Sequence, residues 1–252
     1  MSLPESIPVS PALLALNLAG RNEAEAARLL TSLADQGNAD AQAMLGQFCL
    51  DGRGMDRDAT QALNWFRLAA AQNHVMAINM LGRCQENGWG CVPDISAALS
   101  NYRRAAEAGL DWGQYNYANL LRMGRGTEPD TAGAFELYMK AAEQGHAKAM
   151  NLVGRFHHEG WAMPVNEAEA EQWYCRSAEG GDFRGQISYA GVLAEQGKIT
   201  ESVAWLREAM KTAIPSVLEG LSQTLLQSPE AAFREVGEEM RTKARNRNTP
   251  PA

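Results

Sequence analysis

Two consecutive stretches decide the fold: residues 37–72, GNADAQAMLGQFCLDGRGMDRDATQALNWFRLAAAQ, and residues 73–108, NHVMAINMLGRCQENGWGCVPDISAALSNYRRAAEA. They carry Leu-Gly, a Gly-x-Gly triplet, an aspartate, an aromatic residue and paired alanines at the same positions, 36 residues apart. A fixed period of this length is the signature of a repeat architecture. Each stretch has two stops at glycine or asparagine, 15 residues apart, which divide it into an upstream and a downstream helical segment.

The stops and helix starts continue along the chain at the same period. One series of stops is Gly37, Asn73, Gly109, Gly145 and Gly181, and the other is Gly52, Gly88, Gly124 and Gly160. Glycine accepts a positive φ at the end of a helix, which is the demand that a repeated helix stop makes. The downstream segments begin behind the N-cap residue types Asp58, Asp94, Asp130 and Asn166. Asp58 with Gln61 and Asn166 with Glu169 have capping-box spacing.

Apolar and small residues place the core on both segments of each repeat. The downstream segments carry apolar residues at steps of three and four, such as Ala62, Phe66 and Ala69, which predict one buried helix stripe. The upstream segments carry a small residue at one position in every copy: Gly46, Gly82, Ala118, Gly154 and Ala190. Small residues let helices approach closely, so we interpret this row as core packing.

These residues resemble the Sel1-like repeat of the tetratricopeptide superfamily. Its pattern is matched in order by Ala41, Leu45-Gly46, Gly52-Arg53-Gly54, Asp58, Ala62, Trp65-Phe66 and Ala69-Ala70. The resemblance implies an all-α fold: a right-handed α-α superhelical solenoid of about six helix-pair repeats plus C-terminal capping helices, about fourteen helices in total. It also implies that the upstream helices line a concave groove.

The period predicts a single repeat domain with the following boundaries. We expect a disordered segment at 1–10, a shortened repeat at 11–36, full repeats at 37–72, 73–108, 109–144 and 145–180, a shortened repeat at 181–212, capping helices at 213–246 and a tail at 247–252. The capping helices are expected at Pro215 to Leu226 and from Pro229 to about Arg245, the latter with Ser228 as N-cap.

Composition excludes several classes of function. The net charge of −7 disfavours non-specific binding to nucleic acid. The four cysteines fall at four different phases of the repeat, which is no disulfide framework. No signal peptide or membrane span is evident, so we expect a cytoplasmic protein of bacterial type.

Candidate catalytic and cofactor motifs are weak. No strand precedes the Gly-x-Gly loops and no lysine-serine pair follows them, so they do not predict a phosphate site. His157, His158 and Glu159 are adjacent and point about 100° apart on a helix, so they cannot share one tetrahedral metal centre. No cofactor and no enzymatic activity are expected. Some cysteine-rich Sel1-like members have been linked to β-lactam binding and hydrolysis, which is the enzymatic alternative, but they carry a cysteine pair in each repeat that this chain lacks.

Positions that vary between repeats are the candidates for recognition, because stacking does not need them. On the upstream helices these positions hold Asn79, Arg83, Tyr115, Asn119, Arg122, Asn151, Arg155 and His158. Amides can bond a peptide backbone and arginines can bind carboxylates, so we expect a partner protein or extended peptide in the groove. The alternative for each residue is ordinary solvated helix surface.

A second row lies in the Gly-x-Gly loops and alternates arginine with tryptophan: Arg53, Trp89, Arg125 and Trp161. Trp89 and Trp161 are secondary interface candidates, since tryptophan is a frequent interface anchor, and the alternative is that each folds into the core. Helical repeats can also read RNA bases, so RNA binding through the groove arginines stays open as a different class of function. The acidic body argues against it.

Overall fold

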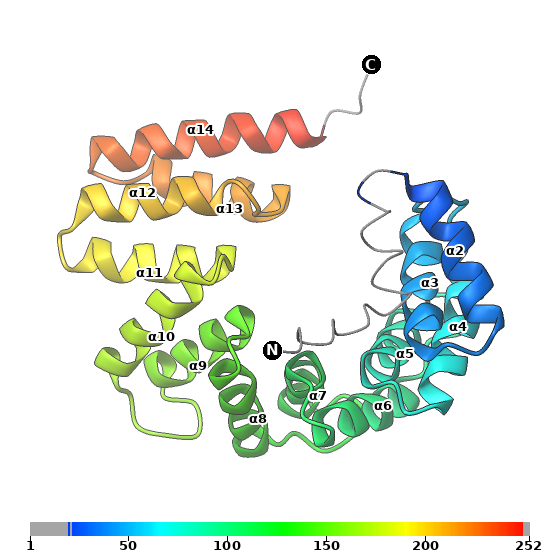
Figure 1. Cartoon of the computed structure of the whole chain (residues 1–252). Helices are drawn as coiled ribbons and strands as arrows, with labels where there is room; N and C mark the ends of the chain where they lie inside the picture. Colours follow the sequence, from blue (N-terminus) through cyan, green and yellow to red (C-terminus); the bar gives the residue numbers. More distant parts are fainter. Residues whose placement is uncertain (1–19, 21, 249–252) are drawn as a thin grey trace, which may run out of the picture. The chain divides into compact units, whose positions relative to one another are not determined.

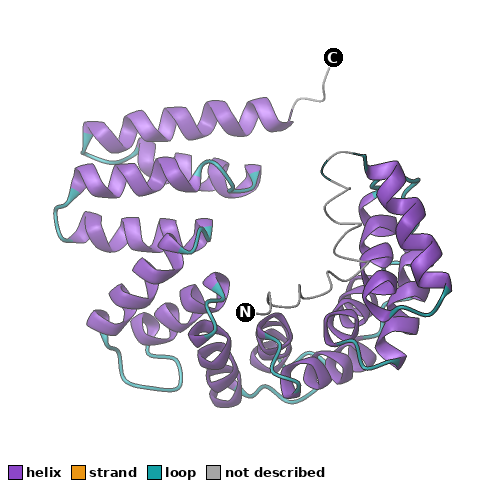
Figure 2. Ribbon diagram, in the orientation of Figure 1, coloured by secondary structure: helices purple, strands orange, loops and turns teal. Residues whose placement is uncertain are grey.

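The chain folds into successive helix pairs. The computed structural model describes residue 20 and residues 22–248. Every regular element of this part is a helix (Figure 2), which confirms the all-α fold class. Thirteen helices lie in the described residues, and the further helix that the shortened first repeat requires would fall within residues 11–19, outside them, as do the expected disordered segment 1–10 and most of the tail.

The helices fall in two compact units, residues 1–129 and 130–252, and each is described by itself. The described part of the first unit contains α2 (Glu23–Asp35), α3 (Ala39–Asp51), α4 (Ala59–Ala71), α5 (Val75–Asn87), α6 (Ile95–Glu107) and α7 (Asp111–Met123) (Figure 1). The second unit contains α8 (Thr131–Glu143), α9 (Ala147–Glu159), α10 (Glu167–Glu179), α11 (Phe183–Glu195), α12 (Ile199–Ala209), α13 (Pro215–Leu226) and α14 (Ala231–Asn248). The single-domain boundaries expected from the sequence stay a prediction.

The repeated caps form as the sequence predicts. Asp58, Asp94, Asp130 and Asn166 cap α4, α6, α8 and α10, and each side chain accepts the backbone N–H three residues later. Gly52, Gly88, Gly124 and Gly160 end the upstream helices with φ between 64° and 73°. The capping boxes are only half formed, because the backbone N–H of Asp58 donates to Cys49 O at 2.9 Å and that of Asn166 to His157 O at 2.9 Å. This bond ties each downstream helix start to the upstream helix of its own repeat.

The last glycine of the Gly-x-Gly loop packs against the backbone of the preceding repeat. A Cβ on Gly90 would stand within 3.0 Å of backbone atoms of Ala59 and Thr60, at the start of α4 in the preceding repeat. A Cβ on Gly54 would meet the Glu23 and Ala24 backbone of α2 in the same way. We call this contact the loop latch. The fourth loop has Ala162 at the equivalent position, with φ 62°.

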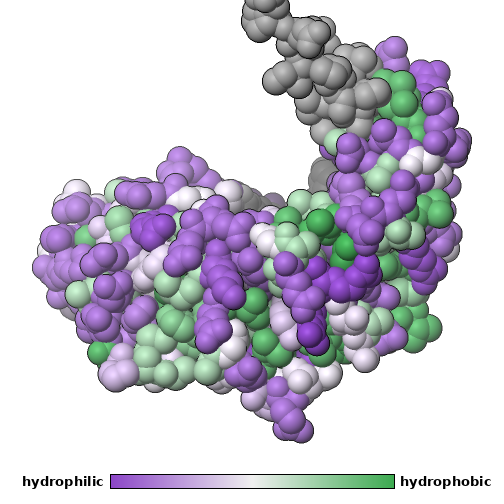
Figure 3. Space-filling view, turned by 60° about the horizontal axis from the view of Figure 1, so that its bottom comes forward, coloured by the Kyte–Doolittle hydropathy of each residue, from purple (hydrophilic) through white to green (hydrophobic). Residues whose placement is uncertain are grey.

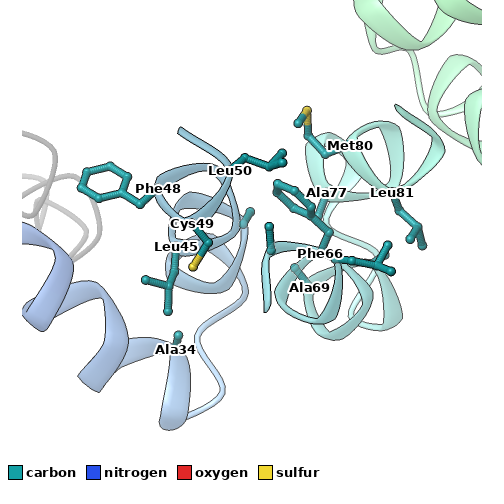
Figure 4. Close-up of a cluster of buried hydrophobic side chains, with 14 of the residues drawn as sticks. Ala34, Leu45, Phe48, Cys49, Leu50, Phe66, Ala69, Ala77, Met80 and Leu81 are labelled. Carbon is teal, nitrogen blue, oxygen red and sulfur yellow. The ribbon is translucent and has the colours of Figure 1, made fainter. Parts of the chain in front are cut away.

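The row of small residues is filled by rings from the downstream helices. A Cβ on Gly46 would come within 2.6 Å of the Phe66 ring, and one on Gly82 within 2.8 Å of Tyr102. Phe66 and Tyr102 are both 1% exposed, and Figure 4 shows Phe66 in the cluster of buried side chains that α3, α4 and α5 share. The small row is therefore core, as predicted.

Contacts also repeat every 72 residues, which is two repeats. His74 and His146 cap α5 and α9, and each Nδ1 accepts the N–H of an alanine three residues later at 3.1 Å. The other repeats, before, between and after these two, have Asn38, Leu110 and Asp182 at this position. Repeats of two kinds therefore alternate along the chain.

The C-terminal helices close the second unit. Helix α13 begins at Pro215 and ends at Leu226, as predicted. Helix α14 begins at Ala231, so the predicted start at Pro229 is wrong by two residues. The Ser228 Oγ accepts the N–H of Glu230, and Arg234 donates to the carbonyls of Ser228 and Pro229, so these residues form a turn ahead of the helix.

Candidate partner-binding surface

The predicted recognition residues lie on upstream helices in both units. Helices α5 and α7 of the first unit carry Asn79, Arg83, Tyr115, Asn119 and Arg122. Helix α9 of the second unit carries Asn151, Arg155 and His158. Figure 3 shows hydrophilic and hydrophobic residues interspersed over one face of the molecule. The contacts of each predicted residue therefore have to be considered one by one.

Asn79 and Asn151 are buried and serve the stack, which corrects the expectation that they face a partner. They are 2% and 4% exposed. The Asn79 Oδ1 accepts from Asn116 Nδ2 at 2.9 Å, and the Asn151 Oδ1 accepts from Ser188 Oγ at 3.1 Å, each on the next upstream helix. A buried amide needs such a partner, and here the partner lies in the neighbouring repeat.

Arg83 and Arg155 are held by the tryptophans of their own loops. The Arg83 guanidinium carbon lies 5.1 Å from the centre of the Trp89 ring, and that of Arg155 lies 4.8 Å from Trp161. Stacking on an indole fixes a guanidinium plane and leaves its N–H edge able to bind. Arg155 also lies 3.7 Å from Glu159, a long and partly exposed ion pair.

The other two loops carry arginine where these carry tryptophan, and their guanidiniums pair with glutamates. Arg53 bonds Glu23 at 3.0 Å, and Arg125 bonds Glu86. Glu86 also accepts the Tyr102 hydroxyl at 2.8 Å. The loops that alternate in the sequence thus have two different roles. The loops with Arg53 and Arg125 form ion pairs with glutamates earlier in the chain, and the loops with Trp89 and Trp161 each stack on an arginine of the same repeat.

The tryptophans are partly core, as the alternative interpretation held. Trp89 packs against the buried cluster of the first unit. Trp161 meets the Phe156 ring edge-on, with ring centres 5.3 Å apart. In this structure Trp89 and Trp161 each stack against an arginine. Their role as direct interface anchors stays a prediction.

Tyr115, Asn119 and Arg122 are all half-buried on α7. Tyr115 meets Trp112 edge to face, with ring centres 6.2 Å apart. Trp112 is 38% exposed, so the first turn of α7 presents an aromatic surface.

A pocket of about 240 Å³ opens between α9 and α11, and we call it the α9–α11 pocket. It brings together two of the predicted recognition residues, Arg155 and His158, with Tyr174 from α10. From α11 it adds Ser188 and Gly191, which sequence reasoning missed. Burial raises the pKa of Tyr174 to about 12, so its hydroxyl stays protonated at neutral pH. Polar and apolar groups line the pocket together, and it carries charges of both signs, from Arg155, Glu159 and Glu195.

A second pocket of about 230 Å³ opens between α3 and α5, and we call it the α3–α5 pocket. It is lined by Ala43, Met44, Phe66, Met76 and Met80, with Asp40, Gln47 and His74 beside them. Phe66 and Tyr174 stand at equivalent positions, three repeats apart, so the same ring position lines both pockets. The sequence feature that could have indicated this pocket is the set of three methionines, Met44, Met76 and Met80, on α3 and α5. Whether they come together depends on how closely these two helices pack.

No metal or reactive-thiol centre emerges from the described residues. His158 Nδ1 lies 3.0 Å from Glu167, whereas His157 packs edge-on against Phe135, so the adjacent histidines have different partners. Within residues 22–248 no three His, Cys, Asp or Glu side chains are placed to hold a metal ion. The four cysteines are free thiols. No helix of the described part is long and apolar enough to cross a bilayer.

The fold and this surface define a class: a helix-pair repeat protein whose variable side chains lie on the upstream helix of each pair. A model of the Sel1 repeat matches residues 16–38, 39–74, 75–110, 113–146 and 147–182, which is more than half of the chain. The chain belongs to the Sel1 repeat family, which confirms the resemblance noted in its sequence. Members of this family are generally protein-interaction scaffolds and typically lack enzymatic activity.

Solved structures of similar fold agree with this assignment. A Sel1 repeat protein from Oxalobacter formigenes is 26% identical, with a TM-score of 0.80 over 96% of this chain and 99% of that one. The protective antigen c5321 of uropathogenic Escherichia coli is 23% identical, with a TM-score of 0.69 over 95% of this chain and 53% of that one. The immunity protein Pa5087 of Pseudomonas aeruginosa is 14% identical, with a TM-score of 0.56 over 82% of this chain and 81% of that one. The last two likenesses concern the fold alone. No curated protein matches the chain.

Proposed function

We propose that this chain is a non-enzymatic adaptor whose upstream helices bind a segment of a partner protein. The observation that carries the proposal is that both pockets open between consecutive upstream helices, at positions that change from repeat to repeat. A peptide segment needs such concave subsites for its side chains and polar groups around them for its backbone. Of the residues predicted from the sequence, Arg83, Tyr115, Asn119, Arg122, Arg155 and His158 remain in the proposed surface.

A protein partner is favoured over RNA by the charge of the chain. The loop arginines Arg53 and Arg125 are already paired with glutamates. With a net charge of −7, the chain has no excess of cations to attract phosphates. The cytoplasmic location expected from the sequence belongs to this proposal and is supported by the free thiols, and cell fractionation tests it.

Site-specific photo-crosslinking in the source cell tests the proposal. A benzoylphenylalanine replaces Gly191 in the α9–α11 pocket, and Gly220 on α13 is the matched control. Both glycines are helical and exposed, and neither has an atom within 4 Å of an added Cβ. In the first unit, Met76 in the α3–α5 pocket is compared with Leu68 on α4, which are 43% and 50% exposed.

We expect protein adducts from Gly191 and Met76 that withstand nuclease, and few adducts from Gly220 and Leu68. Equal adducts from all four positions would contradict the assignment of the upstream helices. Adducts that disappear after nuclease treatment would support RNA binding instead. Thermal melts of the four labelled proteins check that each is folded.

A further inference from the structure

We infer that the α3–α5 pocket anchors a partner segment in which a bulky apolar side chain is flanked by lysine or arginine. This inference rests on the proposed function and specifies the chemistry of the partner.

The size and lining of the pocket suit one large apolar side chain. Its volume of about 230 Å³ exceeds the ~150 Å³ of an engineered apolar cavity that binds benzene. Met44 lies on one wall, Met76 and Met80 lie on the other, and Figure 4 shows Phe66 and Met80 near the space between the helices. Methionine is flexible and polarizable, so such walls adapt to phenylalanine, leucine or methionine of a partner. Met76 is 43% exposed, so its side chain is accessible to a partner at the pocket.

The charge beside the pocket selects a cation. His74 Nδ1 accepts the N–H of Ala77 at 3.1 Å, so the ring proton sits on Nε2, which lies 3.2 Å from Asp40 Oδ1. The Asp40 carboxylate contacts this ring through Oδ1, and the Asp40 side chain is 55% exposed. Helix α3 carries Asp40 and Asp51 and no lysine or arginine. On the facing helix α5, Arg83 Nη1 lies 3.4 Å from the Met80 sulfur, but its guanidinium is stacked on Trp89 and does not line the pocket. A lysine or arginine next to the apolar anchor would therefore find an accessible carboxylate at the pocket.

The α9–α11 pocket differs in both respects, which makes the assignment specific. In the α9–α11 pocket Arg155 and His158 stand beside Glu159 and Glu195, so its carboxylates share the site with a fixed cation. The walls of the α3–α5 pocket are methionine, alanine and Phe66, and Asp40 is its one carboxylate, with no lysine or arginine among the lining residues. An apolar-basic segment should therefore bind at α3–α5 and not at α9–α11.

Methyl NMR of the full chain tests the inference. The methionine methyls are labelled with ¹³C, and the probe is the peptide acetyl-Gly-Lys-Phe-Lys-Gly-amide. One control peptide has alanine in place of phenylalanine, and another has glutamate in place of both lysines. We expect the probe to shift the Met44, Met76 and Met80 methyls and to leave Met123 unchanged. The alanine peptide should cause no shift, and the glutamate peptide should bind at least roughly fivefold more weakly, because it loses an exposed ion pair and sets like charges against Asp40.

Three chain variants sharpen the test. Asp40→Asn should weaken the probe by up to roughly fivefold through loss of the ion pair, while Asp35→Asn, an exposed change of the same charge at the end of α2, should not. Ala43→Phe should fill the pocket and abolish the shifts, with its thermal melt as the check on folding. Equal shifts with the alanine peptide, or equal effects of Asp35→Asn and Asp40→Asn, would overturn the inference. Shifts of the same three methyls on diluting the chain alone would also overturn it, because they would assign the pocket to a second copy.

The outcomes separate this inference from the proposed function. If the probe fails while Gly191 still gives protein crosslinks, only the chemistry assigned to the α3–α5 pocket is wrong. If the crosslinks fail as well, the adaptor function fails with it.

Discussion

An alanine at Gly90 would lose stability in two ways, through the left-handed backbone and through a steric clash with α4. Gly109→Ala is the matched control, because it has the left-handed backbone without the clash. Both glycines have positive φ, 74° and 86°, so alanine at either position bears the left-handed penalty of about 1–2 kcal/mol. An alanine Cβ at position 109 meets nothing within 4 Å. At position 90 it meets backbone atoms of Ala59 and Thr60 under 3.0 Å, and these atoms can move only if the start of α4 moves.

Overpacking of this kind costs typically about 1–3 kcal/mol beyond the backbone penalty. We therefore expect a loss of about 1–2 kcal/mol for Gly109→Ala and about 2–5 kcal/mol for Gly90→Ala. Urea unfolding followed by circular dichroism at 222 nm gives both free energies, provided that the slopes with denaturant agree. If the two variants lose the same free energy of unfolding within about 0.5 kcal/mol, the margin within which independent effects usually add, the steric cost at Gly90 is absent and the loop latch is refuted.

Three further outcomes are expected from the same physical arguments. Asn79→Ala leaves the Asn116 amide without its partner inside the stack and should cost about 1–3 kcal/mol in urea unfolding, while the crosslinks from Met76 and Gly191 persist. Ala162→Gly relieves a left-handed alanine and should raise the free energy of unfolding by about 1 kcal/mol, and an unchanged melting temperature would contradict this. Burial raises the pKa of the Cys49 thiol to about 11 and that of Cys84 to about 12, from 9.0. Only the unfolded chain then ionises these thiols between pH 9 and 10, so the free energy of unfolding should fall as pH rises through that window, and less steeply in Cys84→Ala.

The stops and caps could be predicted because they are local. A helix end at Gly52 or a start at Asp58 depends on the φ of one residue and on one side chain that bonds its own backbone. Nothing beyond the repeat needs to be known. The same reasoning missed the start of α14, because Arg234 bonds the carbonyls of Ser228 and Pro229 and holds them outside the helix.

The candidate surface could be predicted only in part, because burial on an upstream helix is decided by its neighbour. Asn79 and Arg83 lie one turn apart on α5 and look equally available in the sequence. Asn79 is buried because α7 places Asn116 against it, and Arg83 turns toward Trp89 in its own loop. The α3–α5 pocket was missed for the same reason, since its methionines come together only through the distance between two helices.

The alternation of two kinds of repeat bears on how such a chain can be lengthened or cut. The pairs Arg83–Trp89 and Arg155–Trp161, the caps His74 and His146, and the amides of Asn79 and Asn151 all recur after 72 residues. Removing 36 residues would keep the backbone in register but set unlike side chains against each other at the new junction. Removing or inserting 72 would keep these recurring pairs together, so the double repeat is the unit that a gene duplication or a protein engineer can copy with the least repair.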